Sequence, residues 1–276
     1  MNMVRKKSIY TIALFAWGLV VFGATVAVFS GRAAPTVTPD MLPIDGPFGM
    51  FAFAAVPLVA GGALIGLLKR RAWRRAGQRA NLTPEGGGVF GTPTLAGTVN
   101  GRPVRARTIK RRTGGGGEGG SNKSTFTIIE ADLDDHATDG LVIGAGDGDV
   151  PGFSDMPVDI EAESVEGFAV VGTSDELAGE TLTTRARNQL RQPALLDSVL
   201  VGNASDVLLE AIPDSDGFLA GKLTDGIEQK LQEELAGDAG TVRAETSGLI
   251  LDSEELANQI TAVATVADEF ESATTQ

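Results

Sequence analysis

The stretch TLAGTVNGRPVRARTI, residues 94–109, decides the fold of the larger part of this chain. It holds two strand-forming runs, 94–99 and 102–109, on either side of Asn100-Gly101. Asn-Gly is the strongest short signal for a tight hairpin, because both residues tolerate the positive φ angles that a type I′ turn requires. The stretch therefore predicts two adjacent antiparallel strands.

Further strand-like runs follow this hairpin. They are predicted at 124–131, 141–144, 168–171, 198–201, 207–211 and 241–251. The first four strands are expected to form an antiparallel meander, with a glycine-rich link at 114–120. Gly202-Asn203 predicts a second hairpin, between 198–201 and 207–211.

Three helices are predicted among these strands. The first spans 173–191, where Thr173 and Glu176 resemble a capping box, and the second spans 224–236. The last begins after a cap at Asp252 or Ser253, and its apolar positions recur at helical spacing. These positions are Leu256, Ile260, Val263, Ala267 and Phe270. The order of elements predicts an α+β domain with an antiparallel sheet and helices on one face.

Two apolar segments precede this domain. Residues 9–29 and 48–68 each lack charged side chains and are long enough to cross a hydrocarbon core as a helix. They predict an N-terminal transmembrane hairpin within residues 1–80, followed by an acidic domain over 81–276. Neither segment holds an ionisable residue, which argues against an ion pathway.

The flanks of these segments predict the topology. Basic residues precede the first segment and follow the second, whereas the loop between them carries only Arg32 against Asp40 and Asp45. The positive-inside rule places both termini in the cytoplasm of a multi-pass cell-membrane protein, with Trp73 near the inner membrane edge. The basic flanks are Arg5, Lys6, Lys7, Lys69, Arg70, Arg71, Arg74, Arg75 and Arg79.

Small residues mark a packing face on the second segment. Gly62 and Gly66 stand four residues apart, a spacing that allows close approach of two helices. The two segments are expected to pack on each other through this face. Homodimerisation through the same face stays open as an alternative.

Charge is divided sharply along the chain. Residues 1–112 hold 16 Lys+Arg and 3 Asp+Glu, or +13, which leaves 7 and 33, or −26, for residues 113–276. The basic part adjoins apolar segments, so a membrane is the expected contact and nucleic acid is not. Dispersed carboxylates in the acidic part are typical of a halophilic, acidic proteome, where most of them serve solvation.

The composition removes several chemistries. The chain has no cysteine and one histidine, His136, which excludes thiolate metal sites and leaves little for a histidine-based site. Glycine-rich runs at 117–124 and 144–149 depart from phosphate-binding patterns, so no cofactor and no catalytic residue are assigned. An oxygen-rich cluster is the weak candidate for binding a cation. Its carboxylates are Asp132, Asp134, Asp135 and Asp139.

Basic residues concentrate on the first hairpin. They are Arg102, Arg105, Arg107, Lys110, Arg111 and Arg112. If this run is a strand, Arg105 and Arg107 share one face. Two interpretations stay open: the residues contact the membrane or an acidic partner, or they balance the domain's own carboxylates.

Two stretches resemble a known family. The run GTVNGRPVRARTIKRR at 97–112 with STFTIIEADL at 124–133, and FAVVGTSDELAGETLT at 168–183, are similar to two-pass membrane proteins of halophilic archaea. They are more distantly similar to a bacterial membrane-associated domain of unknown function. The resemblance covers most of the chain and supplies no catalytic residues to carry over.

The expected function is therefore that of a membrane-anchored, non-enzymatic interaction or scaffold domain that faces the cytoplasm and binds a protein partner. One alternative is a membrane-tethered, hydrolase-like enzyme that uses a pair of carboxylates. A second alternative is a sensor of anionic lipid, working through the basic residues between 69 and 112.

Overall fold

The computed structural model describes residues 47–86, 94–113, 122–134, 137–145, 163–165, 167–193, 196–210 and 240–275. By its internal contacts the chain divides into two compact units. The first holds residues 1–69 and 88–91, and the second holds residues 70–87 and 92–276. The second unit, called the domain below, thus begins at Arg70, earlier than the expected start at residue 81.

The second apolar segment lies on helix α2 (Pro47–Ala80), whereas the segment at 9–29 lies outside the described residues. Within the described part of the chain, no helix meets the length and apolarity needed to cross a membrane.

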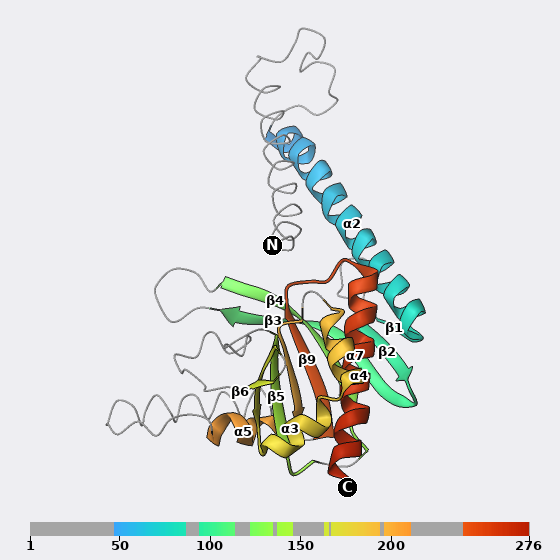
Figure 1. The fold of residues 1–276 in the computed structure, drawn as a ribbon. Coiled ribbons are helices and arrows are strands. Elements are labelled where there is room, and N and C mark those ends of the chain that lie inside the picture. The colour runs from blue at the N-terminus through green and yellow to red at the C-terminus, as the bar shows by residue number, and fades with distance from the viewer. Residues whose placement is uncertain are drawn as a thin grey trace, which may run out of the picture. The chain divides into compact units, whose positions relative to one another are not determined.

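A nine-stranded sheet forms the centre of the domain, and each of its strand pairs is antiparallel (Figure 1). Its spatial order is β1-β2-β3-β4-β9-β8-β5-β7-β6. The strands are β1 (Leu82–Glu85), β2 (Thr94–Val99), β3 (Arg102–Thr113), β4 (Asn122–Asp132), β5 (Gly140–Ala145), β6 (Glu163–Val165), β7 (Phe168–Gly172), β8 (Ser198–Gly202) and β9 (Thr241–Ser247). The α+β class predicted from the sequence is confirmed.

The hairpin that opens the domain is confirmed. Val99 pairs with Arg102 across the turn. The φ angles of Asn100 and Gly101 are 54° and 87°, and both are positive, as a type I′ turn requires. The predicted meander is wrong at its fourth strand. Strand β9, which is distant in sequence, pairs with β4, and β5 lies between β8 and β7.

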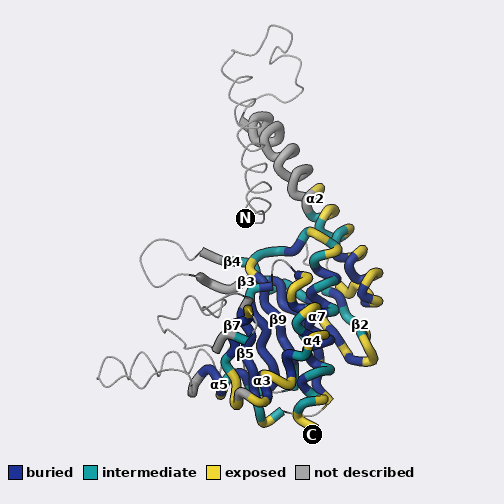
Figure 2. The backbone as a smooth tube through the Cα atoms, viewed as in Figure 1, coloured by how far each residue is buried: buried dark blue, intermediate teal, exposed yellow. Residues whose placement is uncertain are grey.

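Three helices cover one face of this sheet: α3 (Asp175–Thr181), α4 (Thr184–Arg191) and α7 (Ser253–Thr274) (Figure 1). The long C-terminal helix is confirmed, with Asp252 as its cap. Its whole predicted apolar stripe is buried (Figure 2). One row of sheet residues meets these helices, because directly paired residues point to the same face. The row is Leu95, Ala106, Ile129, Ala244, Val199, Ile143 and Val170.

The single helix predicted at 173–191 is wrong, because the chain breaks at Leu182 into α3 and α4. Ser174, not Thr173, caps α3 by accepting from the backbone N–H of Leu177 at 3.2 Å. Thr183 caps α4 in the same way through Ala186. A second cap inside the run restarts the helix in a new direction and lets Leu182 enter the core.

The strand predicted at 207–211 is also wrong, because helix α5 (Ala204–Glu210) begins there. Gly202 has φ of 58 and ends β8. Ala204, Val207 and Leu208 are buried, and their spacing is that of a helix face. The helix packs on β5 and β7, and these three side chains lie outside the core that contains α7. The helix predicted at 224–236 lies outside the described residues.

The opposite face of the sheet carries charged side chains at its centre. Arg107 lies 2.7 Å from Glu130, and Arg243 lies 3.5 Å from Glu245. Arg243 and Glu245 are buried, at 5% and 6% exposure. Their strand positions alternate with the core row, which places them on the face away from α7.

Candidate functional site

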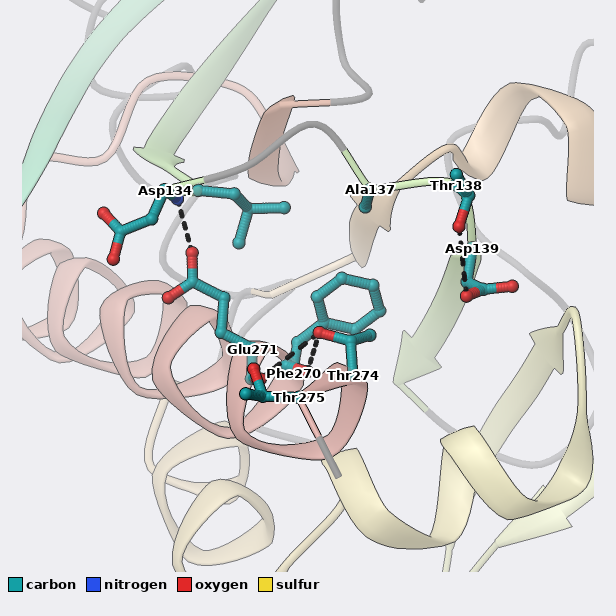
Figure 3. Close-up of a pocket in the computed structure, with 9 residues that line it drawn as sticks. Asp134, Ala137, Thr138, Asp139, Phe270, Glu271, Thr274 and Thr275 are labelled. Carbon is teal, nitrogen blue, oxygen red and sulfur yellow. Dashed lines mark hydrogen bonds between the residues drawn. The ribbon is translucent and has the colours of Figure 1, made fainter.

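A cavity of about 370 Å³ lies at the C-terminal end of α7 (Figure 3). It is formed where the end of α7 meets the segment between β4 and β5. Its lining residues are Leu133, Asp134, Ala137, Thr138, Asp139, Phe270, Glu271, Thr274 and Thr275. The lining thus combines three carboxylates and three threonine hydroxyls with the apolar side chains of Leu133, Ala137 and Phe270.

Arg102 fixes one wall of this cavity. Its guanidinium donates to both oxygens of Glu271, to Asp268 at 3.3 Å and to the backbone carbonyl of Asp132 at 2.6 Å. The side chain is 8% exposed. This cluster ties the start of β3 and the end of β4 to the last turns of α7.

The ion pair shifts the pKa of both partners. The hydrogen bond from Arg102 lowers the pKa of Glu271, and the backbone N–H of Asp134 adds to this effect, whereas burial opposes it. The hydrogen bond to Glu271 raises the pKa of Arg102 against the opposing effect of burial. Glu271 is therefore held as an anion, which suits an acceptor of hydrogen bonds and not a group that delivers a proton at neutral pH.

The predicted cation cluster is only partly assembled. Asp134 and Asp139 both line the cavity, whereas Asp132 is exposed at the end of β4. Asp135 and His136 lie outside the described residues. In the described ranges, no group of three or more His, Cys, Asp or Glu residues is arranged to hold a metal ion.

The structure divides the basic residues of the first hairpin. Arg102 and Arg107 balance the domain's own carboxylates, as one of the two interpretations expects. Arg105 and Lys110 are exposed. Arg111 and Arg112 are placed by the backbone pairing of β3 with β4.

The expected place of Trp73 at the membrane edge needs correction. Its side chain is fully buried in the domain, and its indole N–H donates to the backbone carbonyl of Ile250 at 3.0 Å. An indole in a protein core needs such an acceptor, and the loop before α7 supplies it. Ala76 and Ala80 are buried along the same side of α2.

The basic residues around Trp73 lie on other sides of α2. Arg71, Arg74, Arg75 and Arg79 are exposed, and Lys69 and Arg70 are partly exposed. Arg79 lies 3.9 Å from Glu254 of α7. Gly62 and Gly66 belong to α2, whereas Arg5, Lys6 and Lys7 lie outside the described residues.

Two features of the domain were not predicted. The buried pair of Arg243 and Glu245 lies on β9. The alternation of apolar and charged residues there predicts a strand, but it does not predict that the charged side chains are buried. The contact of Trp73 with Ile250 joins residues 177 positions apart, and the 73-76-80 spacing was its only local signal.

Comparisons of this chain with protein-family models, with curated proteins and with solved structures find no match.

Proposed function

We propose that this chain is an integral membrane protein in which segments 9–29 and 48–68 anchor a cytoplasm-facing α+β domain, and that this domain is a non-enzymatic interaction or scaffold module. The observation that carries the proposal is the burial of Trp73. The helix that bears the second apolar segment continues into the core of the domain, so anchor and domain share one element.

Exposed leucines support the anchor. Leu64, Leu67 and Leu68 of α2 are 59%, 57% and 52% exposed. Grouped large apolar side chains are unfavourable in water and mark a surface that contacts lipid or protein. The next residues in the sequence, from Lys69, are the basic flank that the positive-inside rule places in the cytoplasm.

The tight packing of α2 against the sheet supports its proposed role as the element that carries the domain. A Cβ atom on Gly77 would lie 2.7 Å from the backbone oxygen of Leu82 and 3.1 Å from Leu95. The helix therefore approaches β1 and β2 as closely as backbone atoms allow. The part of α2 that belongs to the domain is therefore fixed firmly to the sheet.

The roles of the paired charges support the non-enzymatic half of the proposal. Glu271 is held ionised by Arg102, and Glu130 is paired with Arg107. These contacts join elements of the fold, which is a structural use of charge. A scaffold needs this rigidity and does not need a carboxyl group whose pKa is raised toward neutrality.

Co-purification from native membranes tests the proposal. The tagged full chain should fractionate with membranes at high salt and should bring down a stoichiometric protein partner or a second copy. The replacement of Leu64, Leu67 and Leu68 by serine should move it toward the soluble fraction, whereas Ser205→Ala on α5 should not. A membrane-bound chain with neither partner nor oligomer would contradict the scaffold role.

A carboxylate-dependent hydrolase is the second candidate, because Asp134, Asp139 and Glu271 all line one cavity. Its test is turnover of ester and phosphoester substrates by the purified full chain. This candidate requires that Asp139→Asn abolish the turnover while Asp206→Asn, on α5, leaves it intact. Absence of turnover, or equal turnover in both variants, would eliminate it.

A further inference from the structure

The hairpin of β3 and β4 extends beyond its neighbours in the sheet. Strand β2 pairs with β3 only up to Ala106, and β9 pairs with β4 only from Phe126 onward. In the described part of the chain, residues 110–113 and 122–125 therefore have no strand neighbour other than each other. We call these eight residues the ribbon.

The ribbon is basic within an acidic domain. It carries Lys110, Arg111, Arg112 and Lys123, and it contains no carboxylate. The register places Arg112 directly opposite Lys123. A two-stranded ribbon is marginally stable in water, and a run of basic residues in the sequence favours contact with an anionic surface.

The ribbon lies at the same end of the domain as the arginines of α2. The backbone N–H of Gly248 donates to the carbonyl of Thr125, at the base of the ribbon, at 2.6 Å. Two residues further along the chain, the carbonyl of Ile250 accepts from Trp73 of α2. The short loop between β9 and α7 thus contacts both elements. We call Arg71, Arg74, Arg75 and the four basic residues of the ribbon the basic end.

Carboxylates at this end have internal partners. Asp252 accepts from the backbone N–H groups of Glu254 and Glu255, and Glu254 lies near Arg79. Glu255 accepts from Gln259, and Asp197 accepts from the backbone N–H of Ser247. The seven cations of the basic end outnumber these four carboxylates, one of which already faces Arg79, so positive charge is in excess among the residues named here.

We propose that the basic end binds the anionic headgroups of the membrane surface and thereby fixes the orientation of the domain on the bilayer. The inference rests on the proposed membrane anchorage. Lipid fits this end better than an acidic protein does, because α2 carries the basic residues directly after the apolar segment 48–68. Juxtamembrane basic residues bind anionic lipid through the same attraction.

The experiment uses the full chain in lipid nanodiscs. The protein has no cysteine, so Thr113→Cys gives a single labelling position on the ribbon. A fluorophore there reports contact through quenching by headgroup-labelled lipid. Discs of phosphatidylcholine alone are compared with discs of phosphatidylcholine and phosphatidylglycerol in equal parts, at one fixed salt concentration.

Quenching should be about fivefold stronger or more in the anionic discs. Each basic residue near an anionic surface multiplies the ratio of surface-bound to unbound ribbon by roughly that factor. The triple variant Lys110→Glu, Arg111→Glu, Arg112→Glu should lose the difference. A second variant with glutamine at the same positions should weaken it without adding negative charge. The matched control is the triple variant Arg185→Glu, Arg187→Glu, Arg191→Glu on α4. Arg185 contacts Glu269, near the C-terminal end of α7 and away from the ribbon. This control makes the same change in net charge and should keep the quenching.

Equal quenching in both lipids, or quenching that survives the triple substitution, would overturn the inference. Cross-linking of the ribbon to an acidic protein in native membranes, without quenching by lipid, would overturn it as well. A chain that enters neither kind of disc would instead contradict the membrane anchor, so the two failures are distinguishable. Circular dichroism of each variant confirms that the domain is folded.

Discussion

Trp73 and Arg102 are buried side chains that join distant parts of the domain to α7 or to the loop before it. Trp73 attaches α2 to the loop before that helix, and Arg102 attaches the start of β3 to its last turns. Each is buried, and each donates a hydrogen bond to a partner more than 160 residues away, Ile250 for Trp73 and Glu271 for Arg102. Their removal should therefore cost more than the removal of a surface residue.

The first prediction concerns Trp73. Trp73→Phe keeps most of the ring but leaves the carbonyl of Ile250 without its donor, and should lower the free energy of unfolding by about 1–3 kcal/mol. Trp73→Ala also opens a cavity and should cost about 3–5 kcal/mol. Denaturant titration of the full chain in detergent measures both. Unchanged stability of Trp73→Phe would contradict the hydrogen bond.

The second prediction concerns Glu271 and pH. Its pKa is lowered in the folded state, so its contribution to stability is present above the usual value of 4.5 and is lost as the pH falls through the folded value. Glu271→Gln should therefore destabilise the domain at about pH 7 and much less at about pH 3. Thermal unfolding across this range measures the difference. A constant difference between variant and wild type would contradict the ion pair.

The sequence allowed some of these roles to be predicted. Arg102 was named among the basic hairpin residues that could balance the domain's own carboxylates, but its partners come from a helix that only the tertiary fold brings close. Trp73 follows an apolar segment and precedes arginines, which is typical of a membrane edge. Its burial depends on an acceptor at Ile250 that no local pattern reveals.

Local signals decide the elements that were predicted well. Asn100-Gly101 determines the hairpin through its positive φ angles, and Asp252 together with the apolar stripe determines α7. Helix α5 was missed because a β-branched valine and two leucines after a Gly-Asn turn are equally typical of a strand. The neighbours of β4 were missed because pairing between distant strands leaves no local trace.

The third prediction concerns the cap of α7. Asp252→Ala removes the acceptor for the backbone N–H groups of Glu254 and Glu255 and should cost about 1 kcal/mol. Ser253 was the other residue considered for this cap, so Ser253→Ala is the matched control and should change stability by less than about 0.5 kcal/mol. A larger loss at Ser253 than at Asp252 would reverse the assignment.

The fourth prediction compares two helical glycines. A Cβ on Gly77 of α2 would meet the backbone oxygen of Leu82, whereas nothing lies within 4 Å of one on Gly179 of α3. Gly77→Ala should therefore destabilise the domain by about 1–3 kcal/mol. Gly179→Ala should stabilise it by up to about 1 kcal/mol through helix propensity. Stabilisation by both substitutions would show that α2 does not pack against β1 and β2.

At the scale of the whole molecule, the chain combines a basic, apolar N-terminal part with an acidic α+β domain. The domain includes the C-terminal part of α2 and buries Trp73, Ala76 and Ala80 of that helix in its core. The boundary between the two compact units therefore lies at residue 70, whereas the change from basic to acidic sequence lies near residue 112. The sheet has one face covered by α3, α4 and α7 and another that carries paired charges. The proposed interaction role assigns the function of the domain to its surfaces.

The most direct test of the central proposal, a cytoplasm-facing domain on a membrane anchor, is cysteine accessibility in intact cells. The chain has no natural cysteine, so Ser272→Cys on α7 and Thr36→Cys between the two apolar segments each give one reactive position. An impermeant maleimide should label position 36 in intact cells and position 272 only after lysis. Labelling of position 272 in intact cells, or recovery of the chain in the soluble fraction, would contradict the account.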